Sequence, residues 1–267
     1  MQIDVNCDIG ESSALSGTEG NGKASGRNGI DLTPAEEALL AVVTSVNIAC
    51  GYHAGDHNSM AAITRAAASR KLSVGAHPSL MDREGFGRRE MTVAPIEIYN
   101  LVLYQIGALS SFARAAGTVV GHVKPHGALY HMAEKDPDVA EAIVSAVRDA
   151  LPGATIVGQS GGALVAKAVQ MKLRAANEVF ADRQYRPDGS LQPRDRPNAV
   201  ITDPLRAADR IVGLLQTGAI EAIDGSTLAL SADTVCVHGD NPRAPEFARI
   251  LAQTLIDNGV VLKSLGR

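Results

Sequence analysis

The sequence is poor in aromatic residues and contains no tryptophan. Phe, Trp and Tyr make up 3% of its 267 residues, whereas the hydrophobic residues as a group reach 45%. This composition allows a substantial core, but one built from Ala, Val, Leu and Ile packed between helices and strands. No segment reads as a linker and no internal repeat is present, so we expect residues 1–267 to form a single domain.

Other absences exclude several classes of protein. The three cysteines are an odd number in apolar segments, which argues against a disulfide framework and suits a reducing compartment. No apolar run approaches the ~20 residues of a membrane span, and the N-terminus does not read as a signal peptide. Lys and Arg form no basic run in a chain of net charge -4, which argues against a nucleic-acid surface. We therefore expect a cytoplasmic protein that binds neither nucleic acid nor membrane.

Short β-branched segments alternate with Ala- and Leu-rich segments of helical period. This is the pattern of repeated βα units and a parallel sheet. Seven segments are expected to be strands: residues 3–7, 43–49, 72–75, 119–124, 155–157, 178–181 and 234–237. Right-handed crossovers wind such units either into a closed barrel or into an open doubly wound sheet, and the pattern leaves both open.

Helix boundaries are marked by capping residues, and two segments fit no element. Thr33, Pro34 and Glu36 combine an N-cap, a first-turn proline and a capping-box glutamate. The cap-and-proline signal recurs at Asp136-Pro137, Asp203-Pro204 and Asn241-Pro242, and suitable helix ends are Gly117, Gly218 and Gly259. Residues 16–28 are rich in Gly and Ser and predict a flexible loop or insertion. Residues 183–198 are polar and hold three prolines, which predicts a long loop and a candidate lid.

The first expected strand carries polar residues on one face. Side chains alternate along a strand, so Asp4, Asn6 and Asp8 share a face and the apolar residues between them share the other. In a barrel the apolar face meets the helices, and the polar face points inward, where buried carboxylates are costly unless they have partners. The alternative is an edge strand with its polar face in solvent. We favour the inward arrangement, because neighbouring strands show the same pattern.

All seven histidines fall at or just beyond expected strand ends. They are His53, His57, His77, His122, His126, His131 and His238, and their neighbours at the strand ends include Asn47, Asp56, Lys124, Asp182, Arg183 and Asp240. In parallel α/β folds, ligands bind outside the carboxyl ends of the strands. Asp and His supply general acids and bases, and together they can hold a divalent metal. Lys124 and Arg183 could neutralise a phosphate or a carboxylate. For His57 and His131 we favour an ordinary place at a helix start.

Dedicated motifs for other chemistries are missing. The sequence has no H-E-x-x-H or C-x-x-C metal spacing, no G-x-x-x-x-G-K-[ST] loop and no G-x-S-x-G elbow. Residues 158–162 could cradle a phosphate before a helix, but an ordinary βα turn is the favoured interpretation. The cysteines are expected to be small buried apolar side chains. Cys236 alone shares strand parity with His238 and Asp240.

Long matching stretches give a family resemblance. They are IDVNCDIGE, SVNIACGYHAGD, VGAHPS with DREGFGR, LYQIGAL, HVKPHGALY, EVFADRQYRPDGSL and TVCVHGD. With these stretches the sequence resembles the LamB/YcsF family. The resemblance implies a seven-stranded parallel βα barrel, similar to the glycoside hydrolase/deacetylase superfamily. It also implies the ATP-driven opening of 5-oxo-L-proline (pyroglutamate) to L-glutamate, in complex with subunits B and C of a 5-oxoprolinase. Residues 16–28 look like extra length beside the family pattern.

The strand-end residues and the resemblance together give a hypothesis for the site. The expected catalytic residues are Asp8, His53, Asp56, His77, Lys124 and His126. The expected substrate- or phosphate-binding residues are Asn6, Asn47, His122, Asp182, Arg183, His238 and Asp240. ATP is the expected co-substrate, and a divalent metal is compatible with the residue types. Two alternatives stay open: a metal-dependent hydrolase or deacetylase of a sugar-like substrate, and a non-catalytic binding subunit.

Overall fold

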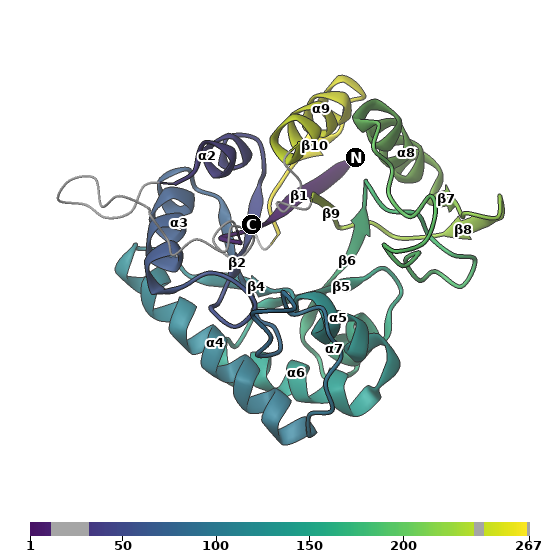
Figure 1. The fold of residues 1–267 in the computed structure, drawn as a ribbon. Coiled ribbons are helices and arrows are strands. Elements are labelled where there is room, and N and C mark those ends of the chain that lie inside the picture. The colour runs from purple at the N-terminus through teal and green to yellow at the C-terminus, as the bar shows by residue number, and fades with distance from the viewer. Residues whose placement is uncertain (12–31, 238–242, 266–267) are drawn as a thin grey trace.

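Seven parallel strands close into a barrel in the computed structural model, which describes residues 1–11, 32–237 and 243–265 (Figure 1). The strands in barrel order are β1 (Gln2–Ile9), β2 (Ser45–Ala49), β3 (Ser73–His77), β4 (Val120–Val123), β5 (Thr155–Gln159), β6 (Arg174–Phe180) and β9 (Thr234–Val237). The last strand pairs with the first, Val5 lying opposite Val235, which closes the sheet. All seven expected segments are barrel strands, and closure decides between the two topologies that the pattern allowed.

Eight helices among the described residues surround the barrel (Figure 1). They are α2 (Pro34–Leu40), α3 (His57–Ser69), α4 (Pro95–Ala115), α5 (Gly127–Lys135), α6 (Pro137–Ala150), α7 (Ala163–Gln170), α8 (Pro204–Thr217) and α9 (Ala244–Asp257). No helix in this part of the chain has both the length and the apolar character that crossing a membrane requires.

The expected helix boundaries are largely confirmed. Thr33 caps α2 in a capping box with Glu36, and Asp136 and Asp203 cap α6 and α8 through their side chains. The three expected end glycines adopt the left-handed conformation shortly after α4, α8 and α9. Asn241 and Pro242 lie outside the described residues, as does the segment 16–28. The described part of α9 begins at Ala244, after Arg243.

Three short elements and one strand start were not expected. Strands β7 (Ala219–Glu221) and β8 (Thr227–Ala229) form a small antiparallel hairpin, and β10 (Val261–Leu262) pairs with the start of β1 outside the barrel. Strand β6 begins at Arg174, although its first residues lack β-branched side chains. Pairing with β5, where Thr155 lies opposite Arg174, extends the strand beyond what local propensity predicts.

The first strand shows how the two faces of the sheet differ. Ile3, Val5 and Cys7 are buried in the apolar layer between barrel and helices. Asp4 and Asn6 are each 1% exposed and are hydrogen-bonded to residues of neighbouring barrel strands. The inward orientation of the polar face is therefore confirmed. The helices are held by Ala, Val, Leu and Ile, while the barrel interior is polar.

The segment after β6 folds back on itself. Isolated antiparallel bridges join Arg183 to Val200 and Tyr185 to Leu191. Tyr185 is fully buried, and its hydroxyl accepts a hydrogen bond of 3.0 Å from the backbone N–H of Phe180. Residues 183–198 thus form the expected long loop, anchored at its start. Its role as a lid stays a prediction.

Candidate active site at the carboxyl end of the barrel

The lowest polar layer of the barrel surrounds one carboxylate, Asp4. Thr44 and Thr234 each donate a hydroxyl hydrogen bond of 2.6 Å to it, and Ser45 donates another. Burial raises the pKa of Asp4 despite these hydrogen bonds. The layer lies at the start of the strands. Its hydrogen bonds satisfy the buried carboxyl group of Asp4.

A middle layer of amides and one histidine supports Asp8 from below. Asn47 donates to Asp8 Oδ1 at 2.8 Å and to Asn6 Oδ1 at 2.7 Å. His122 Nε2 lies 2.9 Å from Asn47 Oδ1, and burial lowers the pKa of His122 to about 3, so the ring is a neutral donor there. Gly75 makes room for this ring, because a Cβ at Gly75 would lie 2.1 Å from His122 Nε2.

Lys124 occupies the centre of the next layer. Its ammonium nitrogen lies 2.9 Å from Asp8 Oδ1, 2.7 Å from Glu178 Oε1 and 3.0 Å from Cys236 Sγ. Burial acts to lower the pKa of Lys124, but the negative charges of Asp8 and Glu178 outweigh it and raise the pKa well above its usual value. Lys124 is therefore a charged residue already neutralised by two carboxylates.

Four buried residues form a cluster above this layer. Glu11 Oε1 lies 3.0 Å from His53 Nε2, 3.4 Å from His126 Nδ1 and 3.9 Å from His77 Nε2. One donor atom from each of the four residues lies within 4.8 Å of the donor atoms of the other three. The rings of His53 and His126 stack at 3.7 Å between centroids with an angle of 3° between their planes. This set, called the histidine cluster below, consists of Glu11, His53, His77 and His126.

The pKa values of the three histidines shift in different directions. Burial lowers the pKa of His53 and of His126 well below the usual value. For His77 burial acts in the same direction, but the charge of Asp8, whose Oδ2 lies 3.5 Å away, outweighs it and raises the pKa. The cluster thus combines two rings that stay neutral with one ring, His77, that binds a proton more readily than usual.

The loop after β3 covers the histidine cluster. The Phe86 carbonyl lies 2.9 Å from His126 Nε2, and the Phe86 ring packs edge-on against His53. Gly87 lies directly against both side chains, since a Cβ there would be 2.8 Å from His53 Cβ and 3.0 Å from His126 Cδ2. Its φ of +65° also favours glycine. Asp82 holds this loop by accepting from the backbone N–H of Gly85 at 3.0 Å.

A cavity of about 830 Å³ opens above the cluster at the carboxyl ends of the strands. Asp8, His77, Lys124 and His126 lie at its base. Its wall holds four arginines: Arg88, Arg183, Arg186 and Arg194.

Arg183 is the buried member of this cationic wall. It is 5% exposed, and its Nε has no hydrogen-bond partner in the described part of the chain. Burial, followed by the charge of Arg194, lowers the pKa of Arg183 to about 10, and the charge of Asp182 opposes this shift only in part. An anion in the cavity would therefore stabilise the guanidinium.

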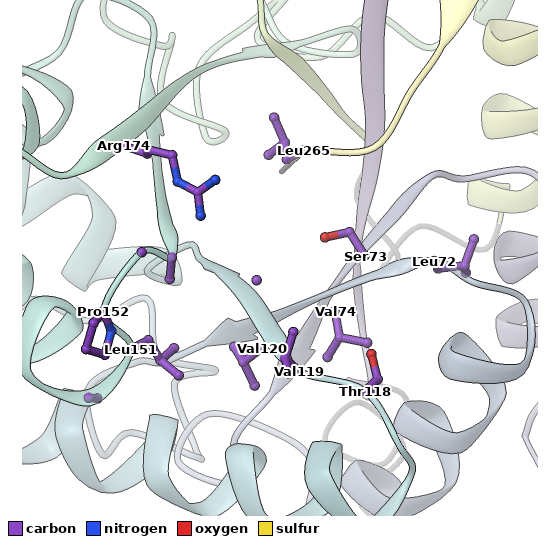
Figure 2. Close-up of a pocket in the computed structure, with 14 residues that line it drawn as sticks. Leu72, Ser73, Val74, Thr118, Val119, Val120, Leu151, Pro152, Arg174 and Leu265 are labelled. Atoms are coloured by element: carbon purple, nitrogen blue, oxygen red, sulfur yellow. The ribbon is translucent and has the colours of Figure 1, made fainter. Parts of the chain in front are cut away.

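A smaller cavity of about 370 Å³ lies at the opposite, amino end of the strands (Figure 2). Its lining mixes apolar side chains, among them the labelled Val74 and Val120, with polar groups. The close-up also shows the Ser73 hydroxyl and the Arg174 guanidinium at its edge. Its described lining lacks the acid-base groups that gather at the other end, so we place the candidate site in the larger cavity.

The structure brings most of the predicted residues together, but in different layers. Of those it describes, Asp8, His77, Lys124, His126 and Arg183 line the larger cavity, whereas Asn6, Asn47, His53 and His122 lie buried beneath it. Asp182 is buried next to Arg183. His238 and Asp240 lie outside the described residues.

Three strand-end residues have ordinary places at helices. Asp56 is exposed and caps α3, accepting from the backbone N–H of Asn58 and Ser59, so the catalytic role expected for it gains no support from its position. His57 is the first residue of α3. His131 lies exposed in α5, at the rim of the larger cavity.

The turn at residues 158–162 is occupied by a side chain of the protein. Glu134 accepts from the backbone N–H of Ala163 at 2.5 Å, and a Cβ at Gly162 would lie 2.2 Å from the same carboxylate. The N-terminus of α7 is therefore already capped by an anion, which supports the ordinary turn over a phosphate cradle.

Sequence reasoning missed Glu11 and Glu178. Glu11 follows β1 after Gly10, whose φ of +82° turns the chain back over the barrel. Its position directly after the polar strand was an available signal. Glu178 has the inward parity of β6 and meets Lys124 only because the barrel closes. Cys236 Sγ contacts Lys124 inside the barrel. The face that Cys236 is expected to share with His238 and Asp240 stays a prediction, because those two residues lie outside the described part of the chain.

The fold and site define a parallel βα-barrel protein with a buried acid-base cluster at the carboxyl ends of its strands, where barrel enzymes hold their active sites. The chain belongs to the LamB/YcsF family, whose model matches residues 3–267. A protein from Methylococcus capsulatus, named as the A subunit of 5-oxoprolinase, is 48% identical over 99% of this chain and 96% of its own length. The protein of the same name from Oceanobacillus iheyensis is 43% identical over 98% and 96%.

Solved structures agree with the fold. The crystal structure of a lactam utilization protein from Thermus thermophilus superposes with a TM-score of 0.87 at 40% identity, covering 99% of this chain and 100% of that one. A structure from Enterococcus faecalis has a TM-score of 0.53 at 10% identity and shares the fold alone.

Proposed function

We propose that this chain is the A component of an ATP-hydrolysing 5-oxoprolinase, and that it opens the lactam ring of 5-oxo-L-proline to give L-glutamate. The observation that carries the proposal is the near-full-length similarity to proteins of that name, 48% identity over 99% of the chain. The buried acid-base groups that open into one cavity of this chain support a catalytic role over a pure scaffold.

The base of the cavity holds the groups that would act on the lactam. A five-membered lactam is a poor electrophile, and ATP can activate it by phosphorylating the amide oxygen. Water then adds to the carbonyl carbon, the C–N bond breaks as the ring nitrogen takes up a proton, and a second water hydrolyses the resulting acyl phosphate to L-glutamate and phosphate. Asp8, His77 and His126 line the cavity and are the candidates for activating the first water. His53 lies beneath them and contacts Glu11, so we assign it to positioning.

The cationic wall is suited to the substrate carboxylate or to a phosphate. Arg183 combines a buried guanidinium with an Nε that has no hydrogen-bond partner among the described residues. We assign this role to Arg183 rather than to Lys124, because Lys124 already contacts Asp8 and Glu178. A planar guanidinium binds carboxylate and phosphate in two-pronged geometry.

ATP as co-substrate and the B and C subunits of 5-oxoprolinase as partners form part of the same proposal. The chain has no standard nucleotide-binding motif, and the turn at residues 158–162 is filled by Glu134. The relatives are named as one subunit of an enzyme, which supports a complex. We also propose that the protein is cytoplasmic and that residues 1–267 form one domain.

The decisive experiment measures glutamate release from 5-oxo-L-proline with and without ATP. The chain is assayed alone and then with subunits B and C. We expect ATP-dependent glutamate only in the full mixture, and its loss with His126→Ala but not with His57→Ala, which alters an exposed histidine at the start of α3. No glutamate from a folded, assembled mixture would overturn the proposal.

The second candidate function is a metal-dependent hydrolase or deacetylase of a sugar-like substrate. The observation in its favour is the histidine cluster, whose donor atoms are close enough to share one ion. Metal-dependent deacetylation of an acetylated sugar by the chain alone, without ATP, would move this candidate to the front.

A further inference from the structure

The tautomers of two histidines in the cluster are set by backbone carbonyls. His77 Nδ1 lies 2.7 Å from the Lys124 carbonyl oxygen, and His126 Nε2 lies 2.9 Å from the Phe86 carbonyl oxygen. A carbonyl oxygen only accepts, so each of these nitrogens carries a hydrogen and donates it. The other nitrogen of each ring, when the ring is neutral, then has a lone pair.

Those two lone pairs face each other. His77 Nε2 and His126 Nδ1 lie 2.9 Å apart, and Glu11 Oε1 lies 3.9 Å and 3.4 Å from them. Two lone pairs and a carboxylate at these distances repel unless a cation lies among them. The cation is either an extra proton on one ring or a metal ion.

The three distances fit a metal ion. For separations of 2.9, 3.4 and 3.9 Å, the point equidistant from the three atoms lies about 2.0 Å from each. Bond lengths to divalent zinc are about 2.0–2.1 Å for histidine nitrogen and 2.0–2.2 Å for carboxylate oxygen. The backbone carbonyls behind His77 and His126 orient the rings in the way that outer partners orient metal-binding histidines.

We propose that Glu11, His77 and His126 bind a divalent transition-metal ion of the zinc class, with its open coordination position facing the larger cavity. Two nitrogen donors favour such an ion over magnesium or calcium, which prefer oxygen. His77 and His126 line the cavity, which gives the open position access to a ligand. A bound ion of this kind would supply a Lewis acid that lowers the pKa of water. With both nitrogens of each ring engaged, His77 and His126 would then act on the water only through the ion, and Asp8 would remain the candidate base.

His53 is a positioning residue in this arrangement. Its Nε2 lies 3.0 Å from Glu11 Oε1, a contact that is favourable when Nε2 carries the hydrogen and donates. His53 then holds the Glu11 carboxylate toward the other two donors. Its Nδ1 is buried and has no hydrogen-bond partner among the described residues. Among these residues, no hydrogen bond at Nδ1 therefore competes with the contact between Nε2 and Glu11.

The test is metal binding by tag-free protein, which does not depend on the identity of the substrate. Zinc affinity and stoichiometry are measured by calorimetry, and Co²⁺ is added as a probe whose visible absorption reports its coordination. We expect one ion per chain. Glu11→Gln, which preserves size, and His126→Ala should each weaken binding by clearly more than the ~100-fold upper limit for loss of an outer partner, whereas the exposed-site control His57→Ala should not change it.

Two further results decide the proposal. His53→Ala should weaken zinc binding by about 10–100-fold, as loss of an orienting partner does. A loss as complete as in His126→Ala would make His53 a ligand and overturn its assignment. If the folded protein binds neither Zn²⁺ nor Co²⁺ at micromolar concentration, or if binding persists in Glu11→Gln and His126→Ala, the cation is a proton and no metal site exists. Glutamate release in the full mixture would still support the oxoprolinase activity.

Discussion

Among single residues, Lys124 is central to the site, because its buried ammonium group lies between two carboxylates. Lys124 is 2% exposed and contacts both Asp8 and Glu178. Buried charges are tolerated only when they are paired, and removal of one partner leaves the other without compensation. Substitution of Lys124 should therefore change the free energy of unfolding, which can be measured separately from activity.

Lys124→Met should lower the free energy of unfolding by roughly 3–5 kcal/mol, because two carboxylates lose their counter-charge. Adding Glu178→Gln to it should restore part of that loss by removing one of those charges. Urea denaturation measures both effects. The matched control is Lys135→Met, which breaks the exposed pair with Glu90 and should cost about 0–1 kcal/mol. A double variant no more stable than Lys124→Met alone would contradict the assignment.

A second prediction about single residues concerns the space beside His122. Gly75→Ala should destabilise the protein by about 1–3 kcal/mol, because its Cβ would overlap the His122 ring and displace it from Asn47. Gly107→Ala is the matched control, since that glycine has open space in the middle of α4 and the change should stabilise by about 0.5–1 kcal/mol. Thermal unfolding measures the change in melting temperature for both variants. A change of the same sign in both would refute the packing argument.

Among the elements, the loop after β3 is fastened by one carboxylate. Asp82 accepts from the backbone N–H groups of Gly85 and Arg89, and it pairs with the Arg89 guanidinium. These contacts hold Phe86 and Gly87 over the histidine cluster. The Arg89 hydrogen bond lowers the pKa of Asp82 to about 2, although burial acts against it.

Asp82→Asn should therefore lower the free energy of unfolding by about 1–2 kcal/mol at neutral pH. A carboxylate with a lowered pKa stabilises the fold above its unfolded pKa, near 3.8, and loses this contribution as the pH falls toward 2. The difference between wild type and variant should stay constant from about pH 7 to pH 5 and shrink below about pH 4, as urea denaturation at several pH values would show. Glu84→Gln, in the same loop but exposed, should have little effect at any pH.

At the scale of the whole molecule, this chain supplies both the acid-base groups at the base of the cavity and the arginines of its wall. The carboxyl ends of β1, β3, β4 and β6 supply its base, and residues 183–194 supply much of its wall. Under the proposed function, recognition of the lactam should then not require the partner subunits, even though turnover does.

The isolated chain should bind 5-oxo-L-proline without ATP. Calorimetry should detect binding by the chain alone, and Arg183→Met should weaken it at least ~10-fold by removing the buried cation at the cavity wall. Arg174→Met, at the opposite end of the barrel, is the matched control and should leave the affinity unchanged. Equal weakening by both variants would show that the anion is not held by Arg183.

Local sequence was enough to place the seven strands, the helix starts at Thr33, Asp136 and Asp203, and the inward face of β1. These are local properties: alternation has a period of two, and a cap involves residues within one helical turn. The long motifs were enough to give the family.

Which polar residues meet depended on the tertiary structure. Lys124 contacts Asp8 across 116 positions of sequence, a contact that exists because the sheet closes. Closure likewise brought Glu178 to Lys124. His122 lies within β4 inside the barrel, whereas His126 lies at the start of α5 and lines the cavity. Asp56 was expected in the site because it follows a strand end, but in the structure it caps helix α3. Spacing along the chain cannot distinguish these outcomes, since the distance between two strand ends depends on barrel order and on the loops that fold over the mouth.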